Sequence, residues 1–336
     1  MARPAVLVTR RIPSAVVDRL RAELDVDYHD AGPGLAPAEL VARAQGKQGL
    51  VTVLTDRIDR AFLEAVPGLR VVANIAVGHD NIDLAAAAAC RVVVTNTPDV
   101  LTEATADLAM GLILAVTRRI AEGDRLVRAG GWRGWTLDFM LGSEIGGKQL
   151  GVVGFGRIGQ ALARRALAFG MRVAYADREA MQTAVARPVA RAAAVAAGAV
   201  SAPAQRLNLD ELLASSDVVS IHVPLSPETR HLIDARALAR MKRSAYLVNT
   251  ARGPVVDEGA LAWALRERLI AGAALDVFER EPEVHADLVG LDNVVLVPHL
   301  GSATTETRTA MADLAARNVI EVLSGRPPLT PVAPAR

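Results

Sequence analysis

The sequence predicts an α/β protein with two parallel-sheet units. Apolar, β-rich runs alternate with helical stretches in both halves of the chain, an order typical of parallel sheets covered on both faces. The length of 336 residues and the hydrophobic share of 51% favour two domains over one. A third observation is a glycine-rich loop, G-x-G-x-x-G at Gly154, Gly156 and Gly159, between an apolar run and a helix.

The first α/β unit runs from residue 1 to about residue 98. A strand is predicted at 4–10 and a helix at 13–23, and further β-rich runs separated by helical stretches lie at 49–56, 70–78 and 90–96. Cys90, at the foot of the last run, is expected to be a buried structural thiol.

A connecting region separates the two series. Residues 102–130 predict one long helix whose first half is apolar nearly all round, which indicates burial against other elements or a partner subunit. Residues 130–142 fit neither the helix nor the strand period, so we expect an irregular segment there. Its Trp132 and Trp135 are expected either to pack in an interface or to shape the mouth of a substrate site.

A second α/β series begins at Gln149. Helices are expected at 157–170 and 305–325, and an alanine-rich, helix-containing connector at 179–206. The β-rich runs of this series lie at 150–155, 171–177, 217–225, 244–251, 270–278 and 293–300.

Composition excludes several classes of function. The 38 basic residues balance the 37 acidic ones, so no basic excess indicates a nucleic-acid partner. No apolar run approaches the roughly twenty residues needed to span a bilayer, and the N-terminus has no long apolar signal region. A single cysteine excludes an internal disulfide and a cysteine-cluster metal site. We therefore expect a cytoplasmic protein with no metal, membrane or nucleic-acid partner.

The glycine loop predicts a dinucleotide site. The first glycine permits a tight turn, the second lets the backbone approach a pyrophosphate, and the third lets helix and strand pack closely. Asp177 ends the next strand, 18 positions after Gly159, where a carboxylate can accept hydrogen bonds from the adenosine ribose. That carboxylate favours NAD(H), whereas its neighbour Arg178 leaves NADP(H) possible. The alternative is a turn whose glycines serve packing only.

Three residues near strand ends in the second half fit the reduction of a carbonyl group by hydride transfer. Arg252 can grip a carboxylate through two hydrogen bonds. His299 is suited to donate a proton, and Glu281 can support it. Each also has an ordinary structural interpretation: a solvated arginine, a surface carboxylate and a hydrogen-bonded core histidine.

Several segments together resemble the D-isomer-specific 2-hydroxyacid dehydrogenase family, over about Val6 to Leu323. The first half, "VANIAVGHDNIDLAAA" and "VTNTPDVLTEATADLAMGLILAVTRRI", resembles the glyoxylate and hydroxypyruvate reductase branch in particular. The other matching segments are "LGVVGFGRIGQALARRALAFGMRVAYADR", "HVPLSPETRHLI", "VNTARGPVVDEGAL", "ALDVFEREP" and "VPHLGSAT".

The resemblance implies roles for individual residues. It implies that Arg252 binds the substrate, that His299 donates the proton, and that Glu281 hydrogen-bonds His299. It also implies that backbone N–H groups of Val77 and Gly78 hold the substrate carboxylate. The implied cofactor-binding residues are Thr105, Gly154, Phe155, Gly156, Arg157, Ile158, Gly159, Asp177, Arg178, Pro224, Thr250, Ala251, Arg252 and Asp276. His79 departs from the family pattern and is either a second cation beside the carboxylate or an exposed loop histidine.

The resemblance also implies a domain plan. A Rossmann cofactor domain, residues 99–299, is inserted into a flavodoxin-like substrate domain made of residues 1–98 and 300–336, both with doubly wound parallel sheets, and the site lies in the cleft between them. Family members are usually dimers through the cofactor domain, so a homodimer is expected.

The implied activity is NAD(P)H-dependent reduction of a small 2-oxo acid, glyoxylate or hydroxypyruvate, to the 2-hydroxy acid. Alternatives are another member such as a phosphoglycerate dehydrogenase, or a cofactor-sensing corepressor or scaffold of the same fold. Glu281 argues against the formate dehydrogenases, in which a glutamine replaces it.

Overall fold

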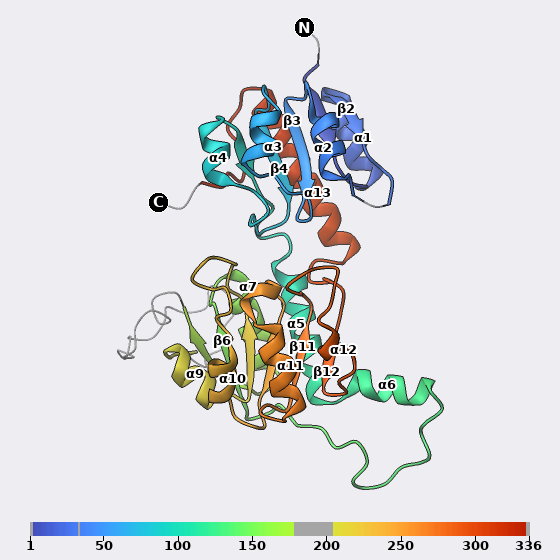
Figure 1. The fold of residues 1–336 in the computed structure, drawn as a ribbon, viewed down its shortest axis with the longest axis vertical. Coiled ribbons are helices and arrows are strands. Elements are labelled where there is room, and N and C mark those ends of the chain that lie inside the picture. Colours follow the sequence, from blue (N-terminus) through green and yellow to red (C-terminus); the bar gives the residue numbers. More distant parts are fainter. Residues whose placement is uncertain (1–2, 33, 178–203, 334–336) are drawn as a thin grey trace. The chain divides into compact units, whose positions relative to one another are not determined.

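The computed structural model describes residues 3–32, 34–177 and 204–333, and two compact units divide the chain. Unit 1 comprises Met1–Leu101 and Ala303–Arg336, and unit 2 comprises Thr102–Ser302. The chain therefore leaves unit 1 once, forms unit 2, and returns (Figure 1). The predicted boundaries, at 98/99 and 299/300, lie three residues before each of these transitions.

Unit 1 holds a five-stranded parallel sheet in the order β2-β1-β3-β4-β5. Its strands are β1 Ala5–Val8, β2 Asp25–Tyr28, β3 Gly49–Val53, β4 Val71–Ile75 and β5 Val93–Thr95. Its helices are α1 Ser14–Glu23, α2 Pro37–Ala44, α3 Arg60–Ala65, α4 Leu84–Ala89 and α13 Thr305–Leu323. The apolar side chains of β1 alternate between two cores: Val6 and Val8 pack with α1 and α13, while Leu7 packs with α2 to α4.

Unit 2 holds a seven-stranded parallel sheet in the order β12-β11-β10-β9-β6-β7-β8. Its strands are β6 Gln149–Val153, β7 Arg172–Ala176, β8 Gln205–Arg206, β9 Val218–Ile221, β10 Tyr246–Asn249, β11 Gly272–Leu275 and β12 Val294–Leu296. Its helices are α5 Thr102–Thr117, α6 Ile120–Arg128, α7 Arg157–Ala168, α9 Leu209–Ser215, α10 Ala235–Arg240, α11 Glu258–Arg266 and α12 Ala286–Val289, with a 3-10 turn, η1, at Gly253–Val255. One core lies between the sheet and α5 and α7, and the other faces α9 to α12. Two parallel-sheet α/β units confirm the predicted fold class.

The prediction of a single long helix at 102–130 is wrong. Arg119 adopts a left-handed backbone conformation, with φ of 54°, between α5 and α6. Its guanidinium makes two hydrogen bonds to the Glu122 carboxylate, at 2.8 and 2.6 Å, which hold the break. α5 is extensively buried, whereas α6 has no buried residue, so the two helices have different surroundings.

Three further features differ from the expectations. Cys90 is exposed, because α4 ends before it and β5 begins only at Val93. The edge strands β2 and β8 lie outside the predicted β-rich runs; β2 alternates aspartate with valine and tyrosine, and β8 has only two residues. Most of the expected connector at 179–206 lies outside the described residues. Among the described residues, no helix is long and apolar enough to cross a membrane.

Candidate active site

The glycine loop follows β6, whose five residues are all buried, and opens α7. Gly154 has a φ of 96°, and a Cβ there would lie 2.8 Å from the carbonyl oxygen of His222. A Cβ on Gly159 would lie 2.4 Å from the Gly154 carbonyl oxygen, so α7 packs against the loop at a distance that only glycine allows. A Cβ on Gly156, the N-cap of α7, would meet nothing within 4 Å. The loop therefore presents open space at a helix N-terminus, where backbone N–H groups suit a phosphate.

The other predicted cofactor residues in this region surround the loop. Phe155 stacks on Tyr175 of β7 with 4.1 Å between ring centroids. Arg157 and Ile158 form the first turn of α7. Asp177 directly follows β7, and its carboxylate pairs with Arg206 of β8, with Oδ1 2.6 Å from Nη2. Arg178 lies outside the described residues, so its predicted part in cofactor binding stays a prediction.

His299 follows β12 and lies beside Glu281, which follows β11. The Nδ1 atom of His299 is 2.8 Å from Oε2 of Glu281, and the Phe278 N–H donates to the other carboxylate oxygen at 3.1 Å. Burial raises the pKa of Glu281, but the hydrogen bond and charge of His299, the Phe278 N–H and the charge of Arg252 together more than offset this, so the net pKa is lowered. An ionised carboxylate at Nδ1 holds the ring and leaves Nε2 as the atom suited to pass a proton.

Asp276 fixes the turn that carries His299. This side chain is completely buried, and its two oxygens accept hydrogen bonds from the N–H groups of Leu300 and Gly301, at 2.5 and 2.8 Å. The His299 N–H donates to the Asp276 carbonyl at 2.9 Å, and Thr105 of α5 donates its hydroxyl to the Gly301 carbonyl at 3.0 Å. These contacts hold His299 in a left-handed conformation with φ of 53°. Burial raises the pKa of Asp276 above its ordinary value, although the two N–H donors oppose this.

Arg252 lies at the end of β10, the strand next to β11. Asn249 orders this turn: its side-chain amide donates to the Arg252 carbonyl at 2.9 Å, and its side-chain oxygen accepts from the Ala251 N–H at 3.0 Å. The charge of Arg252 also helps to lower the pKa of Glu281. The carboxyl ends of β10, β11 and β12 thus bring the three predicted catalytic residues to one edge of the sheet.

The remaining cofactor candidates occupy neighbouring turns of unit 2. Thr250 is buried, and no hydrogen-bond partner for its hydroxyl is found in the described part of the chain. Pro224 is exposed after β9, and its carbonyl accepts a hydrogen bond from the Thr229 hydroxyl at 2.7 Å. Their predicted contacts with the cofactor stay predictions.

The predicted carboxylate loop lies in unit 1, directly after β4. The Asn96 side chain donates to the Val77 carbonyl at 2.9 Å, and the Asn74 side chain donates to the Gly78 carbonyl at 3.0 Å. The sequence analysis did not identify these two asparagines, whose side chains hold the loop in place through its carbonyl groups. His79 is half-buried, and its Nδ1 atom has no hydrogen-bond partner among the described residues. No cluster of metal-ligating side chains is found among those residues either.

The chain is similar in sequence and in fold to known proteins. A model of the D-isomer specific 2-hydroxyacid dehydrogenase, NAD binding domain, matches residues 110–301. The chain is 46% identical over 332 residues to a glyoxylate reductase of Thermococcus onnurineus, covering 98% of this chain and 95% of that one. A protein from Thermus thermophilus has a TM-score of 0.87 at 46% identity, over 98% and 100% of the two chains. An NADPH-dependent glyoxylate/hydroxypyruvate reductase from Sinorhizobium meliloti, solved with NADP and malonate, has a TM-score of 0.83 at 35% identity, over 99% and 97%.

Proposed function

Because the chain belongs to the D-isomer-specific 2-hydroxyacid dehydrogenase family, we infer that it reduces glyoxylate or hydroxypyruvate with a nicotinamide cofactor. It is an NAD(P)-dependent oxidoreductase of the glyoxylate reductase branch. The observation that carries this conclusion is the contact between His299 and Glu281, at 2.8 Å, in the same unit as the glycine loop. A proton donor held by an ionised carboxylate is what the product alkoxide requires.

We assign the roles within this reaction as follows. His299 donates a proton from Nε2 to the developing alkoxide, while Glu281 stabilises the positive ring through Nδ1. Arg252 binds the substrate carboxylate and polarises the carbonyl through its planar fork of donors. The backbone N–H groups of Val77 and Gly78 are the remaining carboxylate donors in this proposal.

The loop after β6 fits a dinucleotide. Gly154 and Gly159 make close contacts that a Cβ would block, and Gly156 borders open space. When bound, the reduced nicotinamide supplies a hydride to C2 of the substrate. We assign cofactor binding to unit 2 and a share of substrate binding to unit 1. NAD(H) is the preferred form in this proposal, because the Asp177 carboxylate can accept hydrogen bonds from ribose hydroxyls.

Initial rates test this function. We expect purified protein to oxidise NADH or NADPH rapidly with glyoxylate or hydroxypyruvate, and more slowly with pyruvate, 2-oxoglutarate or 3-phosphohydroxypyruvate. Crossing both coenzymes with all five acids gives the preferred pair. Fastest turnover of the phosphorylated acid would favour a phosphoglycerate dehydrogenase, and coenzyme binding without turnover would favour a sensor or scaffold.

We further propose that the chain forms a homodimer through unit 2. Figure 1 shows α6 and the irregular segment after it extending away from the sheet of that unit. The segment exposes large apolar side chains, with Trp135 at 76% and Leu137 at 83% of their full accessibility, and Trp132 and Leu141 are also exposed. So many exposed apolar side chains on one extended segment indicate a covering partner, and a second copy provides the same segment.

The oligomeric state gives a direct check. Light scattering after gel filtration is expected to return the mass of two chains for the wild type, and of one chain for a Trp135→Ser, Leu137→Ser double variant. Val289→Ser removes an apolar side chain that is 65% exposed on α12 and is expected to leave the mass unchanged. A wild-type mass of one chain would contradict the proposed dimer.

A further inference from the structure

We propose that Arg206 determines how strongly the protein discriminates between NADH and NADPH, by neutralising Asp177 at the adenosine end of the cofactor site. This inference rests on the proposed cofactor function. Nothing in the glycine-loop pattern points to Arg206, because it lies on a two-residue edge strand far along the chain from Asp177.

Strand pairing puts the two side chains together. β8 pairs in parallel with β7, with Tyr175 opposite Arg206, so Arg206 lies beside the end of β7 that Asp177 follows. Their side chains form an ion pair with 2.6 Å between Nη2 and Oδ1. Arg206 is 16% exposed and Asp177 is 40% exposed, so the arginine lies on the protein side and the carboxylate reaches the surface. A backbone ladder rather than a loop therefore holds the cation.

Tyr175 is a third titratable group beside this ion pair. Burial raises the pKa of the Tyr175 hydroxyl, the charge of Asp177 raises it further, and the charge of Arg206 lowers it. The phenol is thus neutral and contributes no charge near neutral pH. Among these three neighbours, the net charge depends on Asp177 and Arg206 alone.

The consequence for the cofactor is electrostatic. An isolated carboxylate at this position repels the 2′-phosphate of NADPH, while it accepts hydrogen bonds from the free ribose hydroxyls of NADH. With Arg206 in contact, an approaching phosphate meets an ion pair of zero net charge. The guanidinium also has donors that can bond to phosphate oxygens. Arg206 therefore makes NADPH acceptable at a site where Asp177 alone would exclude it.

Titration calorimetry with NAD⁺ and NADP⁺ measures this effect without turnover. Arg206→Gln is expected to weaken the binding of NADP⁺ by about tenfold or more, because a partly buried charge pair is lost. The affinity for NAD⁺ is expected to change less than about threefold. Compared with the wild type, Asp177→Asn is expected to strengthen the binding of NADP⁺ relative to that of NAD⁺. This gain over the wild-type affinity ratio should disappear in the double variant. Arg206→Lys keeps the charge and should retain most of the wild-type ratio.

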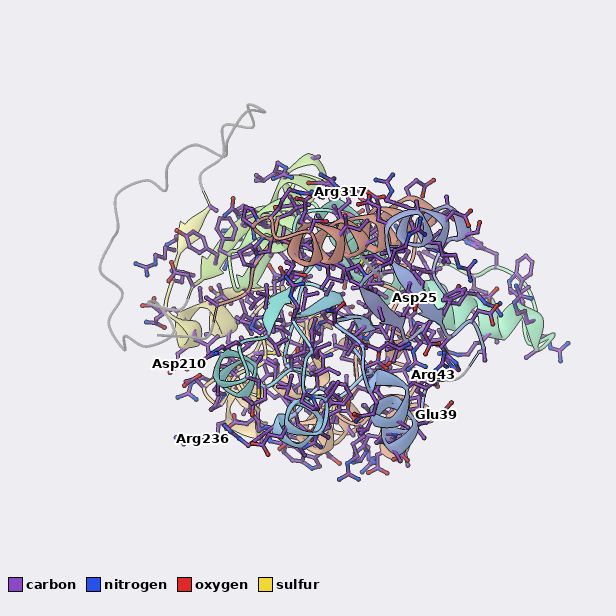
Figure 2. All side chains as sticks on the ribbon, turned by 90° about the horizontal axis from the view of Figure 1, so that it is seen from above. Asp25, Glu39, Arg43, Asp210, Arg236 and Arg317 are labelled. Carbon is purple, nitrogen blue, oxygen red and sulfur yellow. The ribbon has the colours of Figure 1, made fainter. Side chains whose placement is uncertain are left out.

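A matched control is Arg43→Gln. Arg43, labelled on α2 in Figure 2, forms a comparably buried ion pair with Asp27 in unit 1, at 2.5 Å. Its replacement should leave the affinity ratio of the two coenzymes unchanged. Equal changes for both coenzymes in Arg206→Gln, or a double variant with the same affinity ratio of the two coenzymes as Asp177→Asn alone, would overturn the role of Arg206 alone. Failure of the wild type to bind either coenzyme would overturn the proposed cofactor function together with it.

Discussion

Replacement of His299 with asparagine is expected to lower kcat for glyoxylate reduction by about 10³-fold, within the range for losing a positioned acid. Asparagine suits the left-handed backbone at this position, where φ is 53°, so the turn should persist. The amide cannot deliver a proton from the place of the ring nitrogen. The dissociation constant for NADH, measured by fluorescence titration, should change less than about threefold, because the loss falls on the chemical step.

A matched variant separates chemistry from packing. His231 has the same left-handed backbone, with φ of 50°, and its Nε2 atom lies 3.3 Å from the Glu279 carboxylate. His231→Asn therefore removes a histidine–carboxylate pair of the same kind in the same unit, and we expect kcat to remain close to that of the wild type. Retained activity in His299→Asn would exclude His299 as the proton donor.

The second large effect is expected at Arg252. Replacement with glutamine should lower kcat/KM for glyoxylate by about 10³-fold, because a charge-assisted bidentate contact with the substrate carboxylate is lost. Arg252→Lys should recover only part of this loss, since the ammonium keeps the charge but not the planar fork. Steady-state kinetics at saturating coenzyme measure both variants.

Arg280 supplies the control for charge alone. It is exposed and adjacent to Glu281 in sequence, so Arg280→Gln removes the same charge from the segment after the neighbouring strand β11 without touching the proposed substrate contacts. We expect kcat/KM to change less than about threefold. Equal losses in the two glutamine variants would show that Arg252 acts through long-range charge rather than by binding the carboxylate.

Sequence patterns were informative where a feature depends on short-range order. The buried strands are mainly apolar runs, and the glycine spacing belongs to one local strand–turn–helix unit in which Gly159 packs on Gly154, so both can be recognised in the sequence. Patterns were poor guides at edges and breaks. β2 and β8 gain their order from a neighbouring strand, and the break at Arg119 depends on a left-handed residue held by Glu122.

The sequence by itself determined the α/β class, the position of the glycine loop between a strand and a helix, and the residues Arg252, Glu281 and His299 as candidates. It also carried the family resemblance, because the motifs are contiguous and lie in a recognisable order. Only the tertiary structure decided which groups touch. Glu281 and His299 meet because β11 and β12 are neighbours in the sheet, and Asp276 holds the turn that carries His299. Arg206 reaches Asp177 across 29 positions only because β8 pairs with β7. Such contacts depend on which strands become neighbours, and the folded sheet establishes that order.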